Sequence, residues 1–263
     1  MVDTPFLYFV VPVFNEAANM QRLFDACREV ERELGTRFAV RFILVDDGST
    51  DDTSAEAKSA AKGLPLEVLR LDVNGGPGRA FATAFSYLAP LLRPTDWVVT
   101  IEGDNTSRLE LIQQMLTRAE EGFDIVLASP YLYGGGIAHT TAYRVFLSHM
   151  ANLFVKEGLG LHGIVTMSSF FRLYRGSAFL RLQAAFGPGI VERTGFESMI
   201  ELLLKIVYLR MSVSEIAMKL DTSRRAGKSK MKVARTALGY VSLWRDKAAW
   251  QRTAGAFEGG VDR

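Results

Sequence analysis

Short, mostly apolar runs alternate with segments of helical periodicity through the first half of this chain. The runs cover residues 6–13, 38–45, 66–71, 97–101 and 124–128. The segments between them place apolar residues three or four positions apart, as one face of a helix requires. Buried strands that alternate with amphipathic helices are typical of a parallel sheet covered on both faces. The sequence therefore predicts an α/β fold with a mostly parallel sheet sandwiched by helices.

Acidic residues follow two of these runs. Asp46 and Asp47 end one run, and Glu102 and Asp104 follow another. Ligands of open parallel sheets bind outside the carboxyl ends of the strands, so we expect both pairs to face one cleft. Carboxylates one residue apart suit Mg²⁺ or Mn²⁺ that carries a diphosphate. Gly103, between the second pair, would let the backbone pass close to a ligand.

The two halves of the chain differ in charge. Residues 1–130 contain 12 Lys and Arg against 20 Asp and Glu, whereas the remaining residues contain 19 against 9. An acidic front half and a basic back half suggest different tasks. This asymmetry favours a metal in the front half and phosphates or anionic lipid in the back half.

The composition also bounds the compartment. The single cysteine, Cys27, excludes a disulfide framework and fits a reducing environment. The first residues carry no basic region before their apolar run, so no secretory signal is predicted. No uncharged apolar stretch reaches the ~18 residues that a membrane-spanning helix needs. We therefore expect a cytoplasmic protein.

Three motifs in order carry a resemblance to a known family: VPVFNE at residues 11–16, VDDGSTDDT at 45–53 and EGD at 102–104. Together they resemble the family 2 glycosyltransferases of the GT-A fold. In that family the first two motifs hold the nucleotide of a sugar nucleotide, and the third, the DXD motif, holds the metal on its diphosphate. The resemblance implies a Rossmann-like GT-A sheet and an inverting, metal-dependent transfer. A dehydrogenase is disfavoured, because no G-x-G-x-x-G follows the first run.

The resemblance also assigns a donor site, residue by residue. Its members would be Pro12, Phe14, Glu16, Asp46, Asp47, Glu102, Gly103 and Asp104. The first motif would lie near the base, the second at the base and ribose, and the third at the metal and diphosphate. The family motif begins with Asp, so the longer arm of Glu102 favours a contact with the metal through water. Asp104 is expected to bind the metal directly and to act in catalysis.

The back half resembles the polyprenyl-phosphate branch of the same family, the dolichol-phosphate mannose synthase-like enzymes. The similar segments are SPYLYGGG at 129–136, R-x₃-S-x₃-N at 144–152, SFFRLYR at 169–175 and R-x₂-G-x-SKM at 224–231. In that branch the acceptor is a lipid monophosphate. The resemblance implies that Arg144 and Ser148 act catalytically at the acceptor phosphate. Arg172, Arg224 and Lys230 would complete the phosphate-binding set.

Two other functions stay open from the sequence. A transferase that acts on a hydroxyl of a glycan or small molecule needs a general base, for which Glu192, Glu197 and Glu201 are the acidic residues in the relevant region. A nucleotide-sugar-binding protein without catalysis is an alternative of another class. A nucleic-acid partner is not predicted, since few aromatic residues are interleaved with the basic cluster.

The organisation that follows has three parts. We predict a GT-A catalytic domain over residues 1–220, with a nucleotide- and metal-binding half (1–130) and an acceptor-binding half (131–220). A basic loop and a basic amphipathic helix would span 221–252, and a disordered Gly-rich tail 253–263. Such a helix suits an anionic bilayer surface, which would place the protein peripherally at the cytoplasmic face of a membrane. The same helix could instead serve a membrane-protein partner or a homo-oligomer.

Overall fold

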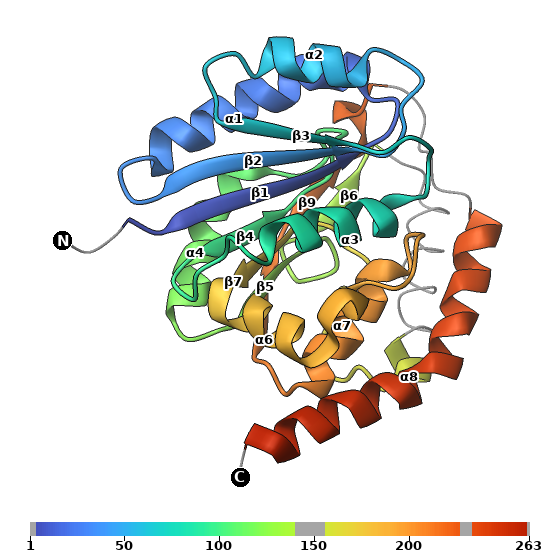
Figure 1. Cartoon of the computed structure of the whole chain (residues 1–263). Helices are drawn as coiled ribbons and strands as arrows, with labels where there is room; N and C mark the ends of the chain where they lie inside the picture. Colours follow the sequence, from blue (N-terminus) through green and yellow to red (C-terminus); the bar gives the residue numbers. More distant parts are fainter. Residues whose placement is uncertain (1–3, 140–155, 227–232, 262–263) are drawn as a thin grey trace.

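The computed structural model describes residues 4–139, 156–226 and 233–261, and it arranges them in layers around one central sheet (Figure 1). The strands are β1 (Phe6–Val13), β2 (Ala39–Asp46), β3 (Leu66–Arg70), β4 (Trp97–Thr100), β5 (Ile125–Ser129), β6 (Gly136–Ala138), β7 (Arg172–Arg175), β8 (Val213–Ala217) and β9 (Lys219–Asp221). The α-helices are α1 (Met20–Leu34), α2 (Thr53–Ala60), α3 (Pro77–Leu88), α4 (Ile112–Glu120), α6 (Gly176–Phe186), α7 (Ser198–Tyr208) and α8 (Val233–Val261). Short 3₁₀ turns are η1 (Ala17–Asn19), η2 (Leu109–Leu111), η3 (Gly187–Ile190) and η4 (Thr222–Arg224).

The large sheet has the strand order β3-β2-β1-β4-β7-β5-β8. Its neighbours are parallel except at β7, which runs antiparallel between β4 and β5. The predicted mostly parallel sheet is therefore confirmed, and each of the five predicted apolar runs forms a strand. The strand β7 was not predicted. A small second sheet pairs β6 with β9.

Alternating side chains of β1 build the two halves of the core. Leu7, Phe9 and Val11 pack with α1, α2 and α4 on one face of the sheet. Tyr8 and Val10 pack with α3, α6 and α7 on the other face. This alternation follows from the two-residue period of a strand. Because both faces are covered, the free ends of the strands are the places where polar groups gather.

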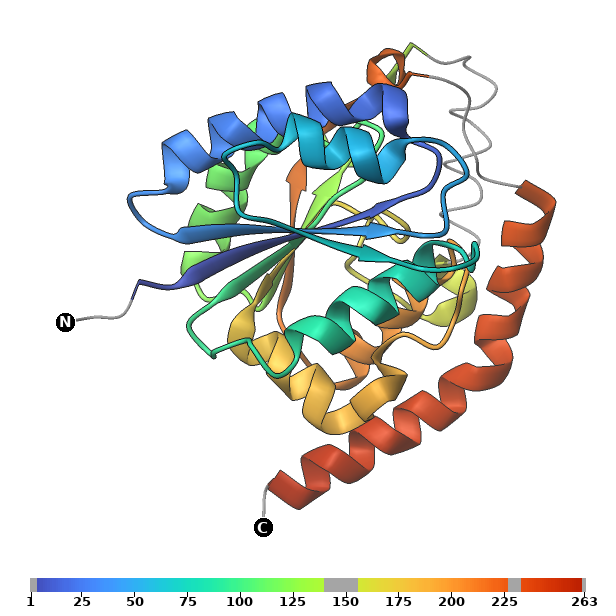
Figure 2. The ribbon, with the colours of Figure 1, turned by 45° about the horizontal axis from the view of Figure 1, so that its top comes forward.

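Helix α8 adds a layer outside α6 and α7 (Figures 1 and 2). Among its residues from 239 onward, Leu243, Trp250 and Ala254 are buried, and Glu258 forms an ion pair with Arg181 of α6. The predicted disordered tail over 253–263 is therefore wrong, because the helix continues to Val261. The apolar stripe extends past the first glycine of the tail, and its packing offsets the ~1 kcal/mol that each glycine costs a helix.

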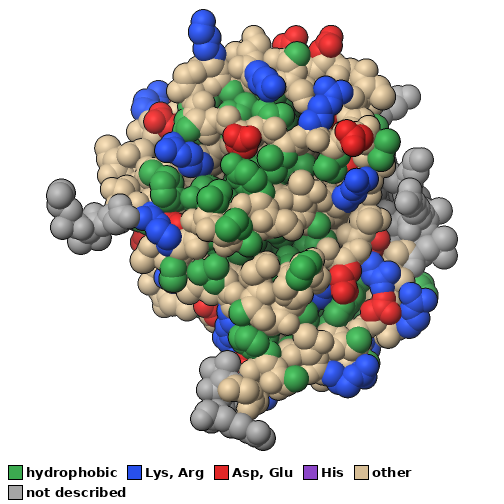
Figure 3. Space-filling model, in the orientation of Figure 1, with side chains coloured by type: hydrophobic (Ala, Val, Ile, Leu, Met, Phe, Trp, Pro, Cys, Tyr) green, Lys and Arg blue, Asp and Glu red, His purple; other side chains and the backbone are tan. Residues whose placement is uncertain are grey.

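The outer surface shows no single-sign patch on the face seen in Figure 3, where Lys and Arg are interspersed with Asp and Glu. The buried side of α8 packs on the protein's own core, so those residues are not available to a bilayer. Within the described residues, no helix is both long and apolar enough to cross a membrane.

Candidate active site at the strand ends

The loops after β1 and β2 are joined by polar contacts. The backbone N–H of Asn15 donates to Ser49 Oγ (2.9 Å), and its side chain accepts from the Thr50 N–H (2.8 Å). The Glu16 N–H donates to Thr53 Oγ1 (2.8 Å). Asn15 has a positive φ of 52°, a conformation that Asn tolerates better than most residues. The first two motifs thus form one folded unit, which also holds Pro12, Phe14 and Glu16 at the end of β1.

Asp46 is fully buried beneath this unit. Its carboxylate accepts from the Ser49 N–H (2.8 Å) and from the Ser54 hydroxyl. Arg70 adds a longer ion-pair contact at 3.9 Å. The charge of Asp46 is therefore compensated inside the protein, and its observed contacts shape the loop.

Asp47 organises the glycine-rich loop that leads into α3. Its carboxylate accepts from the N–H groups of Gly75 (2.9 Å) and Gly76 (2.7 Å) and from Asn74 Nδ2 (2.8 Å). Burial raises the pKa of Asp47, and the two glycine N–H groups oppose that rise. Gly76 has a φ of 94°, which explains why a glycine stands there. Asp47 thereby fixes this loop beside the first two motifs.

Glu102 and Asp104 lie at the end of β4, on the other side of β1. Glu102 accepts from the Ser107 hydroxyl and, at 3.3 Å, from the Phe170 N–H. Burial, followed by the negative charge of Asp104, raises the pKa of the Glu102 carboxyl. Asp104 is only 13% exposed, and one oxygen accepts from Thr106. Two partly buried carboxylates at this spacing favour a cation between or beside them.

Gly103 packs against the end of β1. A Cβ at this position would lie 2.5 Å from Val13 Cγ1 and 3.1 Å from Pro12 O. Gly103 is buried, so its lack of a side chain lets the acidic loop pass close to β1. At the same strand end, the Asp47 N–H donates to Val13 O (2.9 Å). Both acidic pairs therefore meet at the end of β1.

A cation from the distant C-terminal half already contacts Asp104. Arg225 forms an ion pair and a charge-assisted hydrogen bond with Asp104 Oδ2. The sequence pointed to Arg224 and Lys230 as functional residues of this loop and missed Arg225. The signal available was the pair of adjacent arginines, because side chains that neighbour each other along an extended loop point in different directions.

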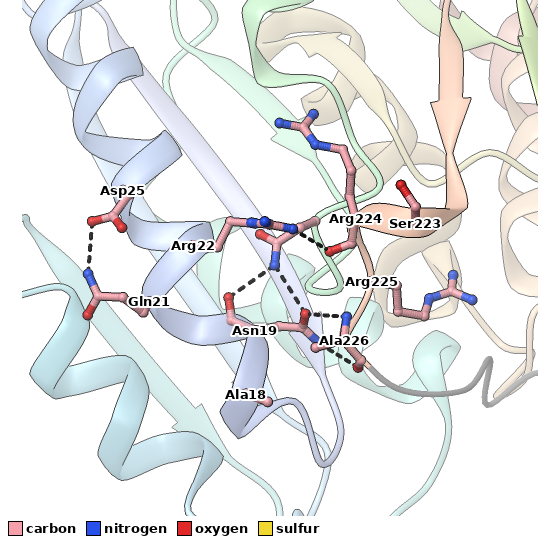
Figure 4. Close-up of a pocket in the computed structure, with 10 residues that line it drawn as sticks. Ala18, Asn19, Gln21, Arg22, Asp25, Ser223, Arg224, Arg225 and Ala226 are labelled. Atoms are coloured by element: carbon pink, nitrogen blue, oxygen red, sulfur yellow. Dashed lines mark hydrogen bonds between the residues drawn. The ribbon is translucent and has the colours of Figure 1, made fainter. Parts of the chain in front are cut away.

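The loop that carries Arg225 docks on the start of α1. Arg22 donates to the Arg224 carbonyl (3.0 Å), and the Ala226 N–H donates to Asn19 Oδ1 (3.0 Å). Figure 4 shows the two arginine side chains of the loop leaving the backbone in different directions. A pocket of about 470 Å³ lies here, lined by Ala18, Asn19, Gln21, Arg22, Asp25, Asn105, Ser223, Arg224, Arg225 and Ala226. The loop thus forms one wall of a polar pocket beside the acidic pair.

The acidic pair can hold a divalent cation only with help. Among the described residues, no cluster of three His, Cys, Asp or Glu side chains is suited to bind a metal. Mg²⁺ and Mn²⁺ commonly take one or two carboxylates together with substrate phosphates and water. Glu102 and Asp104 fit this mode, because the pair supplies hard oxygen ligands and a negative charge that Arg225 now balances.

The predicted acceptor residues have different outcomes. Arg172 is fully buried in β7, where Nε donates to Ser169 O (2.7 Å) and a terminal nitrogen to Met167 O (2.9 Å). The structure therefore gives Arg172 a structural contact in place of the predicted phosphate contact. Arg224 lies in the loop beside the pocket. Arg144, Ser148 and Lys230 fall outside the described residues.

The candidate bases of the hydroxyl-acceptor alternative also differ. Glu201 is fully buried, pairs with Lys205 and accepts from the N–H groups of Glu192 and Arg193 (both 2.8 Å). Burial raises the pKa of Glu201, and the charge of Lys205 opposes the rise. This carboxylate supports the segment before α7 and has no open side for a substrate. Of the three, Glu192 and Glu197 are the ones with exposed surface.

The mostly parallel sheet covered by helices on both faces defines an α/β fold with acidic residues at two strand ends. The model of the family described as "Glycosyl transferase family 2" matches residues 8–182, so the chain belongs to that family and is a glycosyltransferase. A polyprenol monophosphomannose synthase of Mycolicibacterium smegmatis is 26% identical over 254 residues, which is 94% of this chain and 89% of that protein.

Two further comparisons define the family context and the fold. An undecaprenyl-phosphate 4-deoxy-4-formamido-L-arabinose transferase of Pseudomonas paraeruginosa is 30% identical over 64% of this chain, which spans 46% of that longer protein. Both relatives belong to the polyprenyl-phosphate branch that the sequence resembles. A glucosyl-3-phosphoglycerate synthase of Mycobacterium tuberculosis, solved with Mn²⁺, UDP and glucosyl-3-phosphoglycerate, superimposes with a TM-score of 0.60. That match covers 95% of this chain and 80% of the other, at 17% identity, and confirms the GT-A fold.

Proposed function

We propose that this protein transfers a sugar from a nucleoside-diphosphate sugar to a polyprenyl phosphate, with inversion at the anomeric carbon. The observation that carries the proposal is the partly buried acidic pair at the end of β4, beside the folded unit of the first two motifs. The relatives named for polyprenol and undecaprenyl-phosphate substrates support the acceptor class. A membrane lipid as acceptor would bring the enzyme to the cytoplasmic face of a membrane.

The donor site would be built from this chain's own residues. The loops of Pro12, Phe14 and Glu16 receive the base, and Asp47 fixes the loop beside it. Glu102 and Asp104 would hold Mg²⁺ or Mn²⁺ at the diphosphate. A divalent cation bound there would offset the charge that develops on the leaving diphosphate.

Arg225 would act at the same place. Its guanidinium forms an ion pair with Asp104, and a divalent cation held by that carboxylate would release it. A released guanidinium at this point can donate to diphosphate oxygens in a charge-assisted manner. Arg225 therefore supplies a second positive charge to the leaving group without a large movement.

The acceptor needs to be positioned more than deprotonated, because a phosphate is already anionic near neutral pH. We assign this task to Arg144 and Ser148, with Lys230 and Arg224 as further contacts. Arginine fits it, since its guanidinium binds phosphate in a bidentate manner. Attack by a phosphate oxygen on the face opposite the diphosphate forms the new glycosidic bond, breaks the bond to the diphosphate and inverts the anomeric carbon.

The experiment that tests the proposal has two arms. Calorimetry with UDP, GDP and their sugar conjugates, with and without Mn²⁺, should detect metal-dependent binding. A transfer assay with a short-chain polyprenyl phosphate should yield the glycosylated lipid phosphate. Failure of every nucleotide to bind in the presence of metal would refute the donor class. A fully active Arg144→Ala together with an inactive Glu197→Gln would replace the phosphate acceptor with a hydroxyl acceptor.

A further inference from the structure

The segment before α7 contacts, on one side, the glycine-rich loop that Asp47 holds and the first turn of α3. The Gly78 N–H donates to Thr194 O (2.8 Å). A Cβ at Gly78 would lie 1.9 Å from Arg193 O, and a Cβ at Gly76 would lie 2.4 Å from Thr194 O. No side chain fits at either glycine, so the first turn of α3 rests on the backbone of residues 193–194.

The same segment is held on its other side by α8. Arg193 forms an ion pair with Asp246. Trp250 is buried, and its indole N–H donates to Glu192 Oε2 at 2.6 Å. The buried Lys205 lies 4.8 Å from the Trp250 ring centroid, a cation–π geometry. Helix α8 therefore binds residues 192–193 through the side chains of Asp246 and Trp250.

These contacts connect α8 to the donor site without a gap. Asp47 holds Gly75 and Gly76, the loop continues into the first turn of α3, and that turn rests on residues 193–194. The next contact outward is α8. Each step is a hydrogen bond, an ion pair or backbone packing between described residues, so a displacement of α8 from residues 192–193 has a direct route to the loop.

We infer that Asp246 and Trp250 are positioning residues for nucleotide binding, acting on the loop held by Asp47 through residues 192–194. The inference rests on the proposed function only in taking that loop as part of the donor site. It assigns α8 a task inside the catalytic domain, separate from any membrane or partner surface. Loss of either contact loosens the loop while the central sheet stays folded.

The chain offers a matched control. Asp246 and Glu258 are each 27% exposed, and each forms an ion pair that ties α8 to the body of the protein. Of these two carboxylates, Asp246 reaches the segment that supports the loop, whereas the partner of Glu258 is Arg181 of α6. Asp246→Asn and Glu258→Gln therefore remove equivalent surface contacts with different connections to the donor site.

The test has one readout without ligand and one with ligand. In the free protein, Asp246→Asn should speed amide hydrogen exchange of Gly76 and Gly78 about tenfold, and Glu258→Gln should leave both unchanged. Calorimetry with UDP and GDP plus Mn²⁺ should show three- to tenfold weaker binding for Asp246→Asn alone. Asp246→Glu should restore most of both effects, which a loss of general stability would not predict.

If Asp246→Asn fails to fold, Trp250→Phe is the second variant: it keeps an aromatic ring but removes the N–H donor and part of the indole, and it should act in the same direction with a smaller effect. Equal changes for Asp246→Asn and Glu258→Gln, or no change in glycine exchange for Asp246→Asn, would overturn the inference. If the wild-type protein binds no nucleotide, the proposed function fails, while the exchange measurement still decides whether α8 controls the loop.

Discussion

Asp46 and Asp47 end β2, Glu102 and Asp104 follow β4, and both pairs border the end of β1, yet their charges are compensated in different ways. In the first pair, Asp46 accepts a hydrogen bond from the loop that directly follows it, and Asp47 accepts from backbone N–H groups of the glycine-rich loop. In the second pair the two negative charges repel each other, and the counter-ion of Asp104 is Arg225, which lies 121 positions away in the sequence. Similar acidic motifs at similar places therefore do different work.

The two pairs differ in whether their present partners can be replaced by a ligand or a metal ion. The backbone N–H groups that bind Asp47 are a fixed part of the fold, so Asp47 cannot exchange them for a ligand. The guanidinium beside Asp104 is 24% exposed and sits on a short loop, so it can be exchanged for another cation. We propose that Asp46 and Asp47 hold the loops of the donor site in place, and that Glu102 and Asp104 bind its metal.

The largest expected effect is on activity, and it distinguishes the second acidic pair from the first. Asp104→Asn should lower sugar transfer by about 100-fold or more, since the carboxylate that would hold the divalent cation at the leaving diphosphate is lost. The urea midpoint should change little, because Asn keeps the size of the side chain and Thr106 still finds an acceptor. Asp25→Asn is the control, as it removes a carboxylate that lines the pocket beside the acidic pair. If Asp104→Asn transferred sugar at the wild-type rate, the two acidic pairs could no longer be assigned different roles.

The next effect separates them by stability. Asp47→Asn should destabilise the protein by about 2 kcal/mol, because an amide accepts through one oxygen only and leaves one of the partly buried glycine N–H groups unpaired. Urea unfolding measures this loss, and Asp104→Asn under the same conditions provides the comparison. A larger loss of stability in Asp104→Asn than in Asp47→Asn would reverse the roles assigned here.

A smaller effect concerns the counter-ion. Arg225→Gln removes the ion pair that competes with a metal at Asp104, so Mn²⁺ should bind the nucleotide-free protein about fivefold more tightly, as loss of a partly exposed ion pair allows. Arg224→Gln is the matched control, because the Arg224 side chain points elsewhere (Figure 4). Titration with Mn²⁺ by electron paramagnetic resonance measures both. Weaker Mn²⁺ binding in Arg225→Gln would mean that this arginine helps to build the metal site and does not compete with it.

Local pattern was sufficient for the front half of the fold. The run at 6–13 became β1 with the same bounds, because a strand buried on both faces needs an uninterrupted apolar sequence. Helix α1 begins only at Met20, after the turn η1, because Asn15 and Glu16 bond to the neighbouring loop. The acidic pairs fell at strand ends, as predicted, because their place depends only on where each strand stops.

Long-range packing decided what the sequence could not show. Strand β7 has arginine at both ends and only four residues, so nothing local marks it as an internal strand. Its burial between β4 and β5 also removes Arg172 from the surface where its charge would place it. The pairing of Arg225 with Asp104 likewise depends on how η4 docks on α1, which no motif spacing encodes.

The smallest expected effect concerns the turn that delivers Arg225. Asp221 caps η4: its carboxylate accepts from the Ser223 hydroxyl (2.7 Å) and N–H (3.0 Å) and contacts His139. The bonds from Ser223, aided by His139, lower the pKa of Asp221 to about 2. A lowered carboxyl pKa stabilises the turn above the unfolded value of 3.8, and this contribution fades as the pH falls toward 2.

Asp221→Asn should therefore flatten the fall of stability between pH 4.5 and 3, the window above the lowered pKa, by a small but measurable amount in urea midpoints. At pH 7 it should weaken the hold of Arg225 on Asp104 and shift Mn²⁺ binding in the direction of Arg225→Gln. Asp72→Asn, an exposed substitution outside this turn, controls for the loss of one surface charge. An unchanged acid slope in Asp221→Asn would show that the turn is held by its backbone alone, and the contrast between the two acidic pairs would then rest on Arg225 without this support.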